Sequence, residues 1–357
     1  MTLLTRNPAA APIVRHVPAP TPAFGVSQQT VASWKGFNLT DKLVAPVGRP
    51  SPGYRESDFA LMAEWGFTFV RLPVSYLCWT TPRNWRIIDE SQVEHLAQAV
   101  EWGRQYGLHI NLGFHRIPGF SVHKGVKEPF NLFEDAEALD AACYQWQMLS
   151  ERFADCNADL LSFNLFNEPG GVSTETYLRV VDAMTATIRA ISPNRPIVGD
   201  GLGYGHEAVP ELGERGIIHS GRGYMPQEIS HYNAPFWNPG HVGDPDWPLT
   251  KNDGSHYGPA ELEAFHNEWI RLSRAGQPVH IGEFGCYKNT PRKTMMAWMR
   301  DLLAIYDKHH FGWALWGIRG DFGVLDPTRT DVQFEQFRGH RLDREFLELL
   351  QSPLACQ

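Results

Sequence analysis

The chain has 357 residues, 43% of them hydrophobic, which is enough apolar material for one large domain with a full core. Its formal net charge of −8 does not favour nucleic acid as a partner, because nucleic-acid-binding domains present basic patches. No apolar run approaches the roughly 20 residues that a membrane-spanning helix needs, so we expect no membrane partner either.

The first 30 residues are rich in proline and alanine, which predicts an extended arm over residues 1–30 rather than a helix. From residue 31 to 357, short apolar stretches alternate with stretches at helical spacing. Strands are expected at residues 34–39, 67–72, 108–114, 160–166, 196–200, 278–283 and 311–316. One more strand, the sixth in chain order, is expected either at residues 217–220 or, after a turn at Pro226, at residues 228–232.

Helices are expected between these strands, at residues 56–65, 91–106, 137–153, 177–191, 209–215, 259–275 and 294–309, with a last one at 344–350. The helix expected from Ser91 illustrates the sequence signals that predict a helix. Glu94, three residues later, completes a capping box, and Gly107 ends the helix. Its apolar residues recur at helical spacing, at Val93, Leu96, Ala97 and Val100.

About eight strands that alternate with helices predict a parallel sheet with helical crossovers. Over this length the pattern fits an α/β fold, a (β/α)8 TIM barrel, in a single domain at residues 31–357. A doubly wound open sheet is the alternative. No Gly-x-Gly-x-x-Gly motif opens any expected helix, which removes the usual dinucleotide site of such a sheet, and we expect no cofactor.

A barrel places its active site on the rim formed by the carboxyl ends of its strands. The stretch at residues 160–170 contains the end of an expected strand. Its apolar run stops at Asn167-Glu168-Pro169, and the strand cannot continue because Pro169 has no N–H to donate to the hydrogen bonds of a sheet. The polar and aromatic residues near the expected strand ends are Arg71, His115, Asn167, Glu168, His231, Tyr232, Glu283 and Trp316. Although far apart in sequence, they would converge on one rim.

Two carboxylates across one cleft, such as Glu168 and Glu283, are the catalytic groups that glycoside hydrolysis uses. One must be protonated to donate to the leaving oxygen, and the other must be ionised to attack the anomeric carbon. Like charges a few Å apart push their pKa values apart and create this division. A cation such as Arg71 would keep one of them ionised, Asn167 could hydrogen-bond a sugar hydroxyl, and Trp316 could stack on a pyranose ring.

At these residues the sequence resembles glycoside hydrolase family 5, the cellulase-like group of retaining β-glycosidases. The resemblance runs from about residue 34 to residue 350. It rests on five segments that occur in the family's order, Val70-Arg71-Leu72-Pro73, Gly113-Phe114-His115, Phe166-Asn167-Glu168-Pro169, Ile281-Gly282-Glu283-Phe284-Gly285 and Ala314-Leu315-Trp316.

The resemblance implies a role for each of these residues. Glu168 would be the general acid/base on the fourth strand, and Glu283 would be the nucleophile on the seventh. In a retaining enzyme their carboxyl groups lie about 5–5.5 Å apart. Arg71 would support Glu283, and Asn167 would bind the sugar 2-hydroxyl.

The resemblance also implies how the reacting sugar is enclosed. His115 would line the reacting subsite, and Trp316 would be its floor. The family carries a His-x-Tyr at the sixth strand, with the tyrosine touching the nucleophile. Here the nearest match is His231-Tyr232-Asn233, in which the tyrosine comes one residue early. The segment Arg222-Gly223-Tyr224, from the alternative strand, is the weaker candidate.

Three tryptophans fall in loops after the second and sixth strands, and each is either a sugar platform or a packing anchor: Trp79, Trp237 and Trp247. Of these we expect Trp237 to bind substrate. Together the residues predict a retaining glycoside hydrolase that cleaves β-glycosidic bonds in glucans or gluco-oligosaccharides, in the manner of an endo-β-1,4-glucanase.

Three alternatives stay open. An exo-acting β-glycosidase on short or decorated glycans is one, because the long segment at residues 233–257 could wall off one end of the cleft. A non-catalytic carbohydrate-binding barrel is another, because the match at the sixth strand is irregular. A metal-dependent hydrolase ranks last, because His115 and His231 are too few to hold a metal, and we expect none.

The five cysteines include no Cys-x-x-Cys and no zinc-like spacing, and an odd number cannot all pair. A reducing compartment is the simpler interpretation. The first residues also lack the roughly 7–15-residue apolar core of a secretory leader. We therefore expect a cytoplasmic protein, or a secreted one whose leader has been removed.

Overall fold

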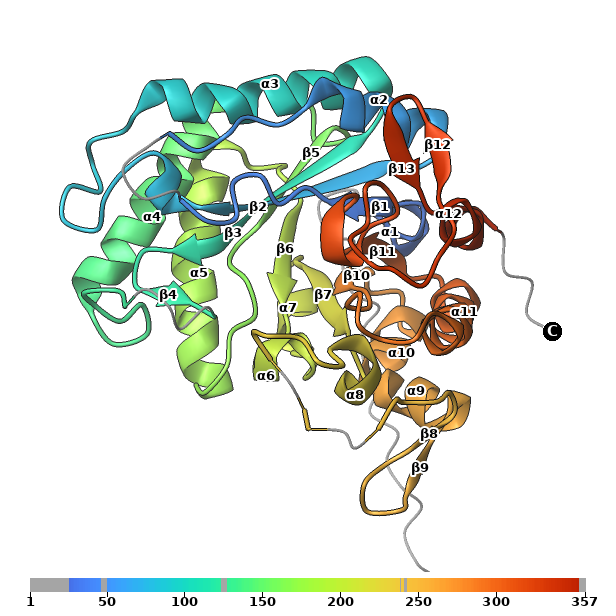
Figure 1. Cartoon of the computed structure of the whole chain (residues 1–357). Helices are drawn as coiled ribbons and strands as arrows, with labels where there is room; N and C mark the ends of the chain where they lie inside the picture. Colours follow the sequence, from blue (N-terminus) through green and yellow to red (C-terminus); the bar gives the residue numbers. More distant parts are fainter. Residues whose placement is uncertain (1–25, 46–49, 123–126, 238, 241–242, 353–357) are drawn as a thin grey trace, which may run out of the picture.

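The computed structural model describes residues 26–45, 50–122, 127–237, 239–240 and 243–352. Eight parallel strands form a closed barrel (Figure 1). They are β1 (Lys35–Asn38), β2 (Phe69–Ser75), β3 (His109–Ile117), β5 (Leu161–Asn164), β6 (Ile197–Asp200), β7 (Ile218–Gly223), β10 (Val279–Phe284) and β11 (Gly312–Leu315). The sheet runs in the order β2, β1, β11, β10, β7, β6, β5, β3, and β2 pairs with β3 to close it. The predicted TIM barrel is confirmed, and the open sheet is wrong.

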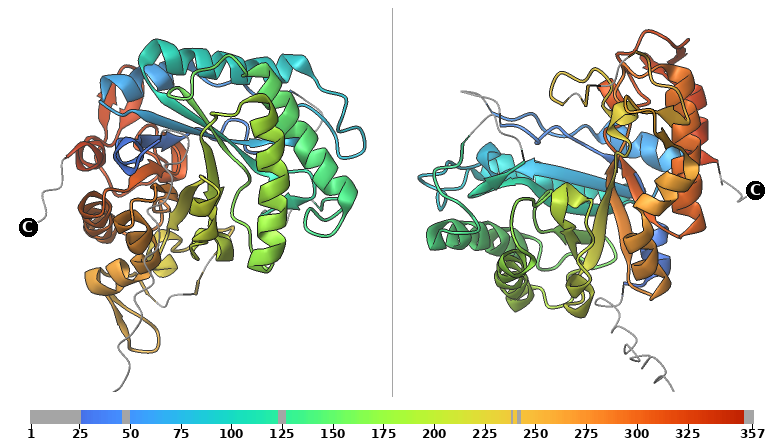
Figure 2. Two further views of the ribbon diagram at one scale, coloured as in Figure 1. Left: turned by 180° about the vertical axis from the view of Figure 1, so that it is seen from behind. Right: turned by 90° about the horizontal axis from the view of Figure 1, so that it is seen from below.

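Helices cover the outside of the barrel (Figures 1 and 2). The longer ones are α2 (Glu56–Glu64), α3 (Glu90–Tyr106), α4 (Ala136–Arg152), α5 (Thr174–Ile191), α9 (Pro259–Phe265), α10 (Asn267–Arg274), α11 (Arg292–Lys308) and α12 (Arg344–Gln351). Figure 2 shows α4 and α5 side by side on one flank, where they pack together. In the part of the chain that the structure describes, no helix has both the length and the apolar character of a membrane span.

Shorter helices and strands lie before and between these main elements. The helical ones are α1 (Gln28–Ala32), η1 (Tyr76–Cys78), α6 (Leu202–Gly205), α7 (Glu211–Glu214), α8 (Gln227–Ser230) and η2 (Gly320–Phe322). The extended ones are β4 (Phe120–Ser121), β8 (Leu249–Thr250), β9 (His256–Tyr257), β12 (Glu335–Phe337) and β13 (His340–Leu342). The hairpin of β8 and β9 projects away from the barrel (Figure 1).

Three of the expected elements differ from the structure in more than their end residues. The sixth barrel strand is β7, so the first of the two expected positions is right, and the chain at 228–232 forms the helical turn α8 instead. The helix expected over 259–275 is divided into α9 and α10 at His266. Residues 1–25 of the expected arm lie outside the described residues, and its last residues belong to α1.

The amino-terminal ends of the strands are filled by side chains and by α1. The side-chain oxygen of Gln28 accepts a hydrogen bond from the backbone N–H of Val279, the first residue of β10, at 2.8 Å. Next to α1, Trp34 stacks on Phe69 and His109 at ring-centroid distances of 5.5 and 4.0 Å. Since this end is packed, ligand access is left to the carboxyl ends of the strands, as expected for this fold.

Candidate active site

A cavity of about 490 Å³ opens at the carboxyl ends of the strands. Its lining is largely aromatic, and Glu168 and Glu283 are the carboxylates among the described residues that line it. The lining residues are His115, Val122, Glu168, Tyr204, His206, Tyr224, Gln227, His231, Phe236, Trp237, Glu283, Trp316 and Phe322. The fold thus brings together residues that are more than 200 positions apart in the chain.

Glu283 projects from β10 and is held through both of its oxygens. Nη1 of Arg71, on β2, donates to Oε1 at 2.6 Å in a buried ion pair. The hydroxyl of Tyr224 donates to Oε2 at 3.3 Å. The amide oxygens of Asn38 and Asn164 each accept from the guanidinium of Arg71 at 2.9 Å and fix it in turn. The carboxylate of Glu283 is therefore held in one orientation.

Glu168 lies in the loop after β5, and 14% of its side chain is exposed. Its φ of 52° is in the left-handed region, which costs a non-glycine residue of the order of 1–3 kcal/mol and is concentrated at functional sites. Burial and then the charge of Glu283 raise the pKa of Glu168 from 4.5 to about 7, although Arg222 opposes the shift. A carboxyl group with such a pKa is suited to general acid catalysis near neutral pH.

Arg222 on β7 lies between the two glutamates. Its Nε donates to Oε1 of Glu168 at 2.9 Å, and its Nη2 is 3.3 Å from Oε1 of Glu283. Nη2 also pairs with Asp200, the last residue of β6, and neither side chain of that pair is exposed. Burial acts to lower the pKa of Arg222, but the charges of the three carboxylates outweigh it and raise the pKa. Arg222 is therefore a permanent cation in the site.

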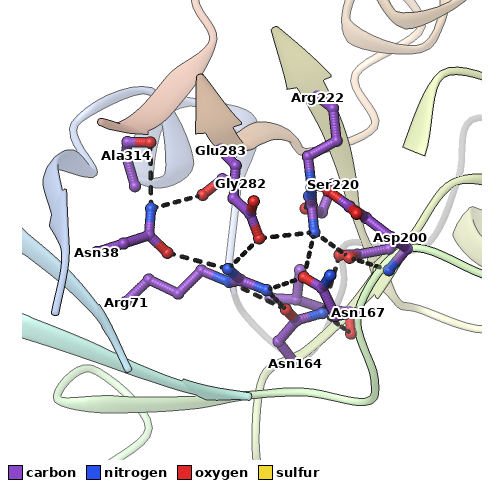
Figure 3. A network of polar contacts seen from close by, with 12 residues as sticks. Asn38, Arg71, Asn164, Asn167, Asp200, Ser220, Arg222, Gly282, Glu283 and Ala314 are labelled. Atoms are coloured by element: carbon purple, nitrogen blue, oxygen red, sulfur yellow. Dashed lines mark hydrogen bonds and ion pairs between the residues drawn. The ribbon is translucent and has the colours of Figure 1, made fainter. Parts of the chain in front are cut away.

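Asn167 connects the two arginines. Its Oδ1 accepts from Arg71 at 2.9 Å and from Arg222 at 2.8 Å (Figure 3). This fixes the amide so that Nδ2 is directed away from both cations, and among the described residues Nδ2 has no hydrogen-bond partner. A buried donor without a partner is costly, which suits this position to an oxygen acceptor on a ligand.

Aromatic rings frame the space in front of the glutamates. The rings of His115 and Trp316 lie 5.6 Å apart with 31° between their planes. The ring of His231 meets that of Tyr224 edge-on at 5.0 Å, and its Nδ1 is 2.7 Å from the hydroxyl oxygen of Ser230. Burial, and then the nearby His206, lower the pKa of His231 to about 4. The imidazole of His231 is consequently neutral at physiological pH.

The sequence model described as Cellulase (glycosyl hydrolase family 5) matches residues 26–320. The protein belongs to glycoside hydrolase family 5. It is thus a retaining glycoside hydrolase, and the family prediction made from the sequence is confirmed.

Two relatives of this enzyme are named as glucan-cleaving hydrolases, and the match covers at least 75% of the length of each. Cellodextrinase A of Ruminococcus flavefaciens is 23% identical over 71% of this chain and 75% of its own. Endoglucanase C of Acetivibrio thermocellus is 22% identical over 78% and 88%. Among solved structures, one glycoside hydrolase matches with a TM-score of 0.85 and 34% identity over 89% of this chain and 98% of that one. A hyperthermophilic endo-β-1,4-glucanase matches in fold, with a TM-score of 0.71 and 18% identity over 93% and 100%.

The tyrosine beside Glu283 is Tyr224, and the placement of Tyr232 there is wrong. The hydroxyl of Tyr232 donates to Asp244 at 2.9 Å, and Tyr232 does not line the cavity. The reason is the position of the sixth barrel strand, which ends at Gly223 and carries Arg222-Gly223-Tyr224 to the rim. Arg222 therefore stands two residues before this tyrosine, where the resemblance implied a histidine.

The three loop tryptophans differ in their surroundings. Trp237 is 53% exposed and lines the cavity. Trp79 is buried and donates from Nε1 to Gln145 at 2.8 Å, while Trp247 donates from Nε1 to Asp301 at 2.6 Å. Since neither lines the cavity, Trp79 and Trp247 are packing anchors and Trp237 is the candidate platform.

Sequence reasoning missed several residues of the site. Those that it did not single out are Asn38, Val122, Asn164, Asp200, Tyr204, His206, Gln227, Phe236 and Phe322. Asp200 carried a usable signal, because it is the last residue of an expected strand. Asn38 and Asn164 lie within β1 and β5, and the others lie in short helical turns and loops between the main elements, whose path the sequence pattern does not give.

No metal centre is apparent in the part of the chain that the structure describes, since no three His, Cys, Asp or Glu side chains there form a group that could hold an ion. His115 and His231 pack against aromatic rings of the cavity.

Proposed function

We propose that this enzyme hydrolyses β-1,4-linked glucans and gluco-oligosaccharides, with Glu283 as the nucleophile and Glu168 as the general acid/base. The observation that carries the proposal is one cavity with two carboxylates in unlike surroundings. Glu283 is fixed by Arg71 and Tyr224, whereas Glu168 is partly exposed and has a pKa of about 7. A retaining mechanism requires this division between an ionised and a protonated carboxyl group.

In the first step, an oxygen of Glu283 attacks the anomeric carbon. As that C–O bond forms, the bond to the leaving oxygen breaks, and the leaving oxygen takes the proton of Glu168. In the second step, ionised Glu168 takes a proton from water while the water oxygen attacks the same carbon. The ester bond then breaks, its electron pair returns to Glu283, and the two inversions together retain the configuration.

The remaining residues of the cavity would place the sugar for this attack. The free Nδ2 of Asn167 suits the 2-hydroxyl next to the reacting carbon. Trp316 offers a flat face to the pyranose ring, with His115 beside it, and neutral His231 offers a ring nitrogen to a hydroxyl. Trp237, exposed at the mouth of the cavity, is suited to stack on a further sugar unit.

The choice of a β-glucan is supported by the relatives, which are named as a cellodextrinase and as endoglucanases. The aromatic lining agrees with it, because flat apolar rings pack against the C–H faces of pyranose sugars. An enzyme that cuts within chains should lower the viscosity of a soluble β-1,4-glucan early in the reaction. Release of monosaccharide without loss of viscosity would instead indicate attack on chain ends.

The proposal is tested by a hydrolysis screen of the purified enzyme on β-1,4-, β-1,3- and mixed-linkage glucans, mannan, xylan and aryl β-cellobiosides. We expect cleavage of β-1,4-glucan and its loss by at least 10³-fold in Glu283→Gln and Glu168→Gln. Glu101→Gln, which changes an exposed glutamate on α3, is the matched control and should keep full activity. Full activity of Glu283→Gln on the same substrate would exclude the assignment.

We further propose that the enzyme works in a reducing compartment such as the cytoplasm. The four described cysteines, Cys78, Cys143, Cys156 and Cys286, are all free thiols, and Cys356 lies outside the described residues. Burial raises the pKa of the Cys286 thiol to about 12, which keeps it unreactive. Fractionation of the native host with an antibody against the protein would test this, and activity confined to the medium would contradict it.

A further inference from the structure

Asp200 and Arg222 form an ion pair that is completely buried next to the cavity (Figure 3). Asp200 ends β6, and Arg222 comes from the neighbouring strand β7. Neither is among the residues that line the cavity, so the pair does not face the substrate directly. Burying two charges is favourable only when further hydrogen bonds satisfy them, and the partners of this pair therefore indicate what it does.

The side-chain carboxylate of Asp200 is bonded to groups that hold the two glutamates. Its Oδ1 accepts from Nδ2 of Asn164 at 3.0 Å, and its Oδ2 accepts from the backbone N–H of Glu168 at 3.0 Å. The same Oδ2 pairs with Arg222. One carboxylate thus holds the left-handed backbone of Glu168 directly and its side chain through Arg222.

The structure leaves space for Arg222 by omitting two side chains. A Cβ on Gly205 would lie 2.5 Å from Cγ of Arg222, and a Cβ on Gly282 would lie 2.9 Å from its Nη1. Gly282 directly precedes Glu283. The guanidinium is further fixed by Ser220, which accepts from Nη1 at 3.1 Å. Arg222 is therefore confined to one position between the two glutamates.

We propose that Asp200 and Arg222 are positioning residues that determine which oxygen of Glu168 carries the catalytic proton. This inference rests on the proposed role of Glu168 as the acid/base. Nε–H of Arg222 can only donate, and it donates to Oε1 of Glu168, so a proton on Oε1 would compete with it. The acid form consequently carries its proton on Oε2. That oxygen gives the proton to the leaving group and later takes one from water.

The charges agree with both steps of the reaction. The two guanidinium groups, Arg71 and Arg222, face three carboxylates, Asp200, Glu168 and Glu283. One proton on Glu168 makes this group neutral before the attack. After the attack Glu283 is an uncharged ester, and ionised Glu168 gives the same neutral sum. Arg222 can therefore donate to Glu168 both before and after the attack, and the total charge of the five side chains does not change.

The first test uses aryl β-cellobiosides whose leaving groups range from phenol to dinitrophenol. A good leaving group departs without a proton, so misplacing the acid should slow only the poor ones. We expect Asp200→Asn to lower kcat/KM for the phenyl substrate about 10- to 100-fold and for the dinitrophenyl substrate less than about threefold. Asp58→Asn, which breaks a partly buried ion pair with Arg319 outside the cavity, is the matched control and should show no dependence on the leaving group.

The second test is an NMR titration of isotope-labelled glutamate carboxyl groups, which needs no substrate. The Glu168 signal is assigned by its absence in Glu168→Gln. Asp200 raises the pKa of Glu168 and Arg222 lowers it, so we expect the midpoint to fall in Asp200→Asn and to rise in Arg222→Gln. Because Arg222→Gln alone leaves a buried carboxylate unpaired, the double variant Asp200→Asn/Arg222→Gln is titrated as well, and its midpoint should lie between those of the single variants.

The outcomes separate the inference from the proposed function. If the parent enzyme cleaves no glycoside, the proposed function fails, while the titration still decides whether the pair controls Glu168. If the parent is active but Asp200→Asn slows all leaving groups equally, the inference is overturned. An unmoved Glu168 midpoint in the single and double variants would overturn it too. Opposite shifts together with the leaving-group dependence would support it.

Discussion

The hydroxyl of Tyr224 donates to Oε2 of Glu283 at 3.3 Å, on the oxygen opposite to the one that Arg71 holds. By donating to the carboxylate, the phenol fixes the orientation of Glu283. This hydrogen bond must weaken when the carboxylate oxygen begins to bond to the anomeric carbon. Burial, together with the charge of Glu283, raises the pKa of Tyr224 well above 10, so the phenol stays a donor throughout the working pH range.

Removal of this hydroxyl should therefore impair catalysis without unfolding the protein. A hydrogen bond to a charged group contributes about 1.5–3 kcal/mol, so we expect Tyr224→Phe to lower kcat about 10- to 100-fold. Tyr232→Phe is the matched control, because its hydroxyl bonds to Asp244 outside the cavity. It should keep kcat within about twofold. Steady-state kinetics on one cellobioside checks both, and equal losses in the two variants would contradict the roles assigned.

The pH dependence should reflect the pKa of Glu168. This group must be protonated in the free enzyme, and its pKa is about 7, so kcat/KM should be sustained below that pH and fall about tenfold for each unit above it. Glu168→Gln should lose this alkaline limb on a dinitrophenyl cellobioside, which needs no acid. A limb that persists unchanged in Glu168→Gln would assign the titration to another group.

The sequence predicts some residues of the site better than others. Glu168 and Glu283 were predicted correctly as rim residues, because short apolar runs end at distinctive motifs there. The sequence does not favour Tyr224 over Tyr232, because β7 carries His219, Ser220 and Arg222, and this polar strand does not show the apolar pattern of its neighbours. The pattern therefore could not choose between two positions for the sixth strand.

Other features of the site depend on contacts that no local pattern encodes. Arg222 has a role only because Gly205 and Gly282, distant in sequence, leave room for its guanidinium. The exposed Trp237 and the buried Trp79 look alike in sequence, since both follow a strand in a loop. What distinguishes them is tertiary packing, which the (β/α)8 pattern leaves undetermined.

Chelation should have no effect on the enzyme. The described residues offer no group of His, Cys, Asp and Glu side chains that could hold an ion, and both proposed steps use carboxyl groups alone. Activity after dialysis against EDTA should stay within about 10% of the untreated enzyme, and added Mg²⁺, Ca²⁺ or Zn²⁺ should not increase it. Loss on chelation with recovery on one metal would require a metal-dependent step.

Trp237 and Trp79 should respond to truncation in opposite ways. Trp237 is 53% exposed at the mouth of the cavity, so Trp237→Ala removes a stacking surface and little packing. If stacking contributes about 1–2 kcal/mol, KM for cello-oligosaccharides should rise about 5- to 30-fold with an unchanged melting temperature.

Trp79→Ala should instead lower stability. Its indole is buried and its Nε1 donates to Gln145, so truncation leaves both a cavity and an unpaired buried amide oxygen. The cost should be about 3–5 kcal/mol in the free energy of unfolding, measured by denaturant titration, with KM close to that of the parent. If Trp237→Ala destabilised the protein as strongly and left KM unchanged, Trp237 would be a packing residue, because a sugar platform is defined by its effect on binding.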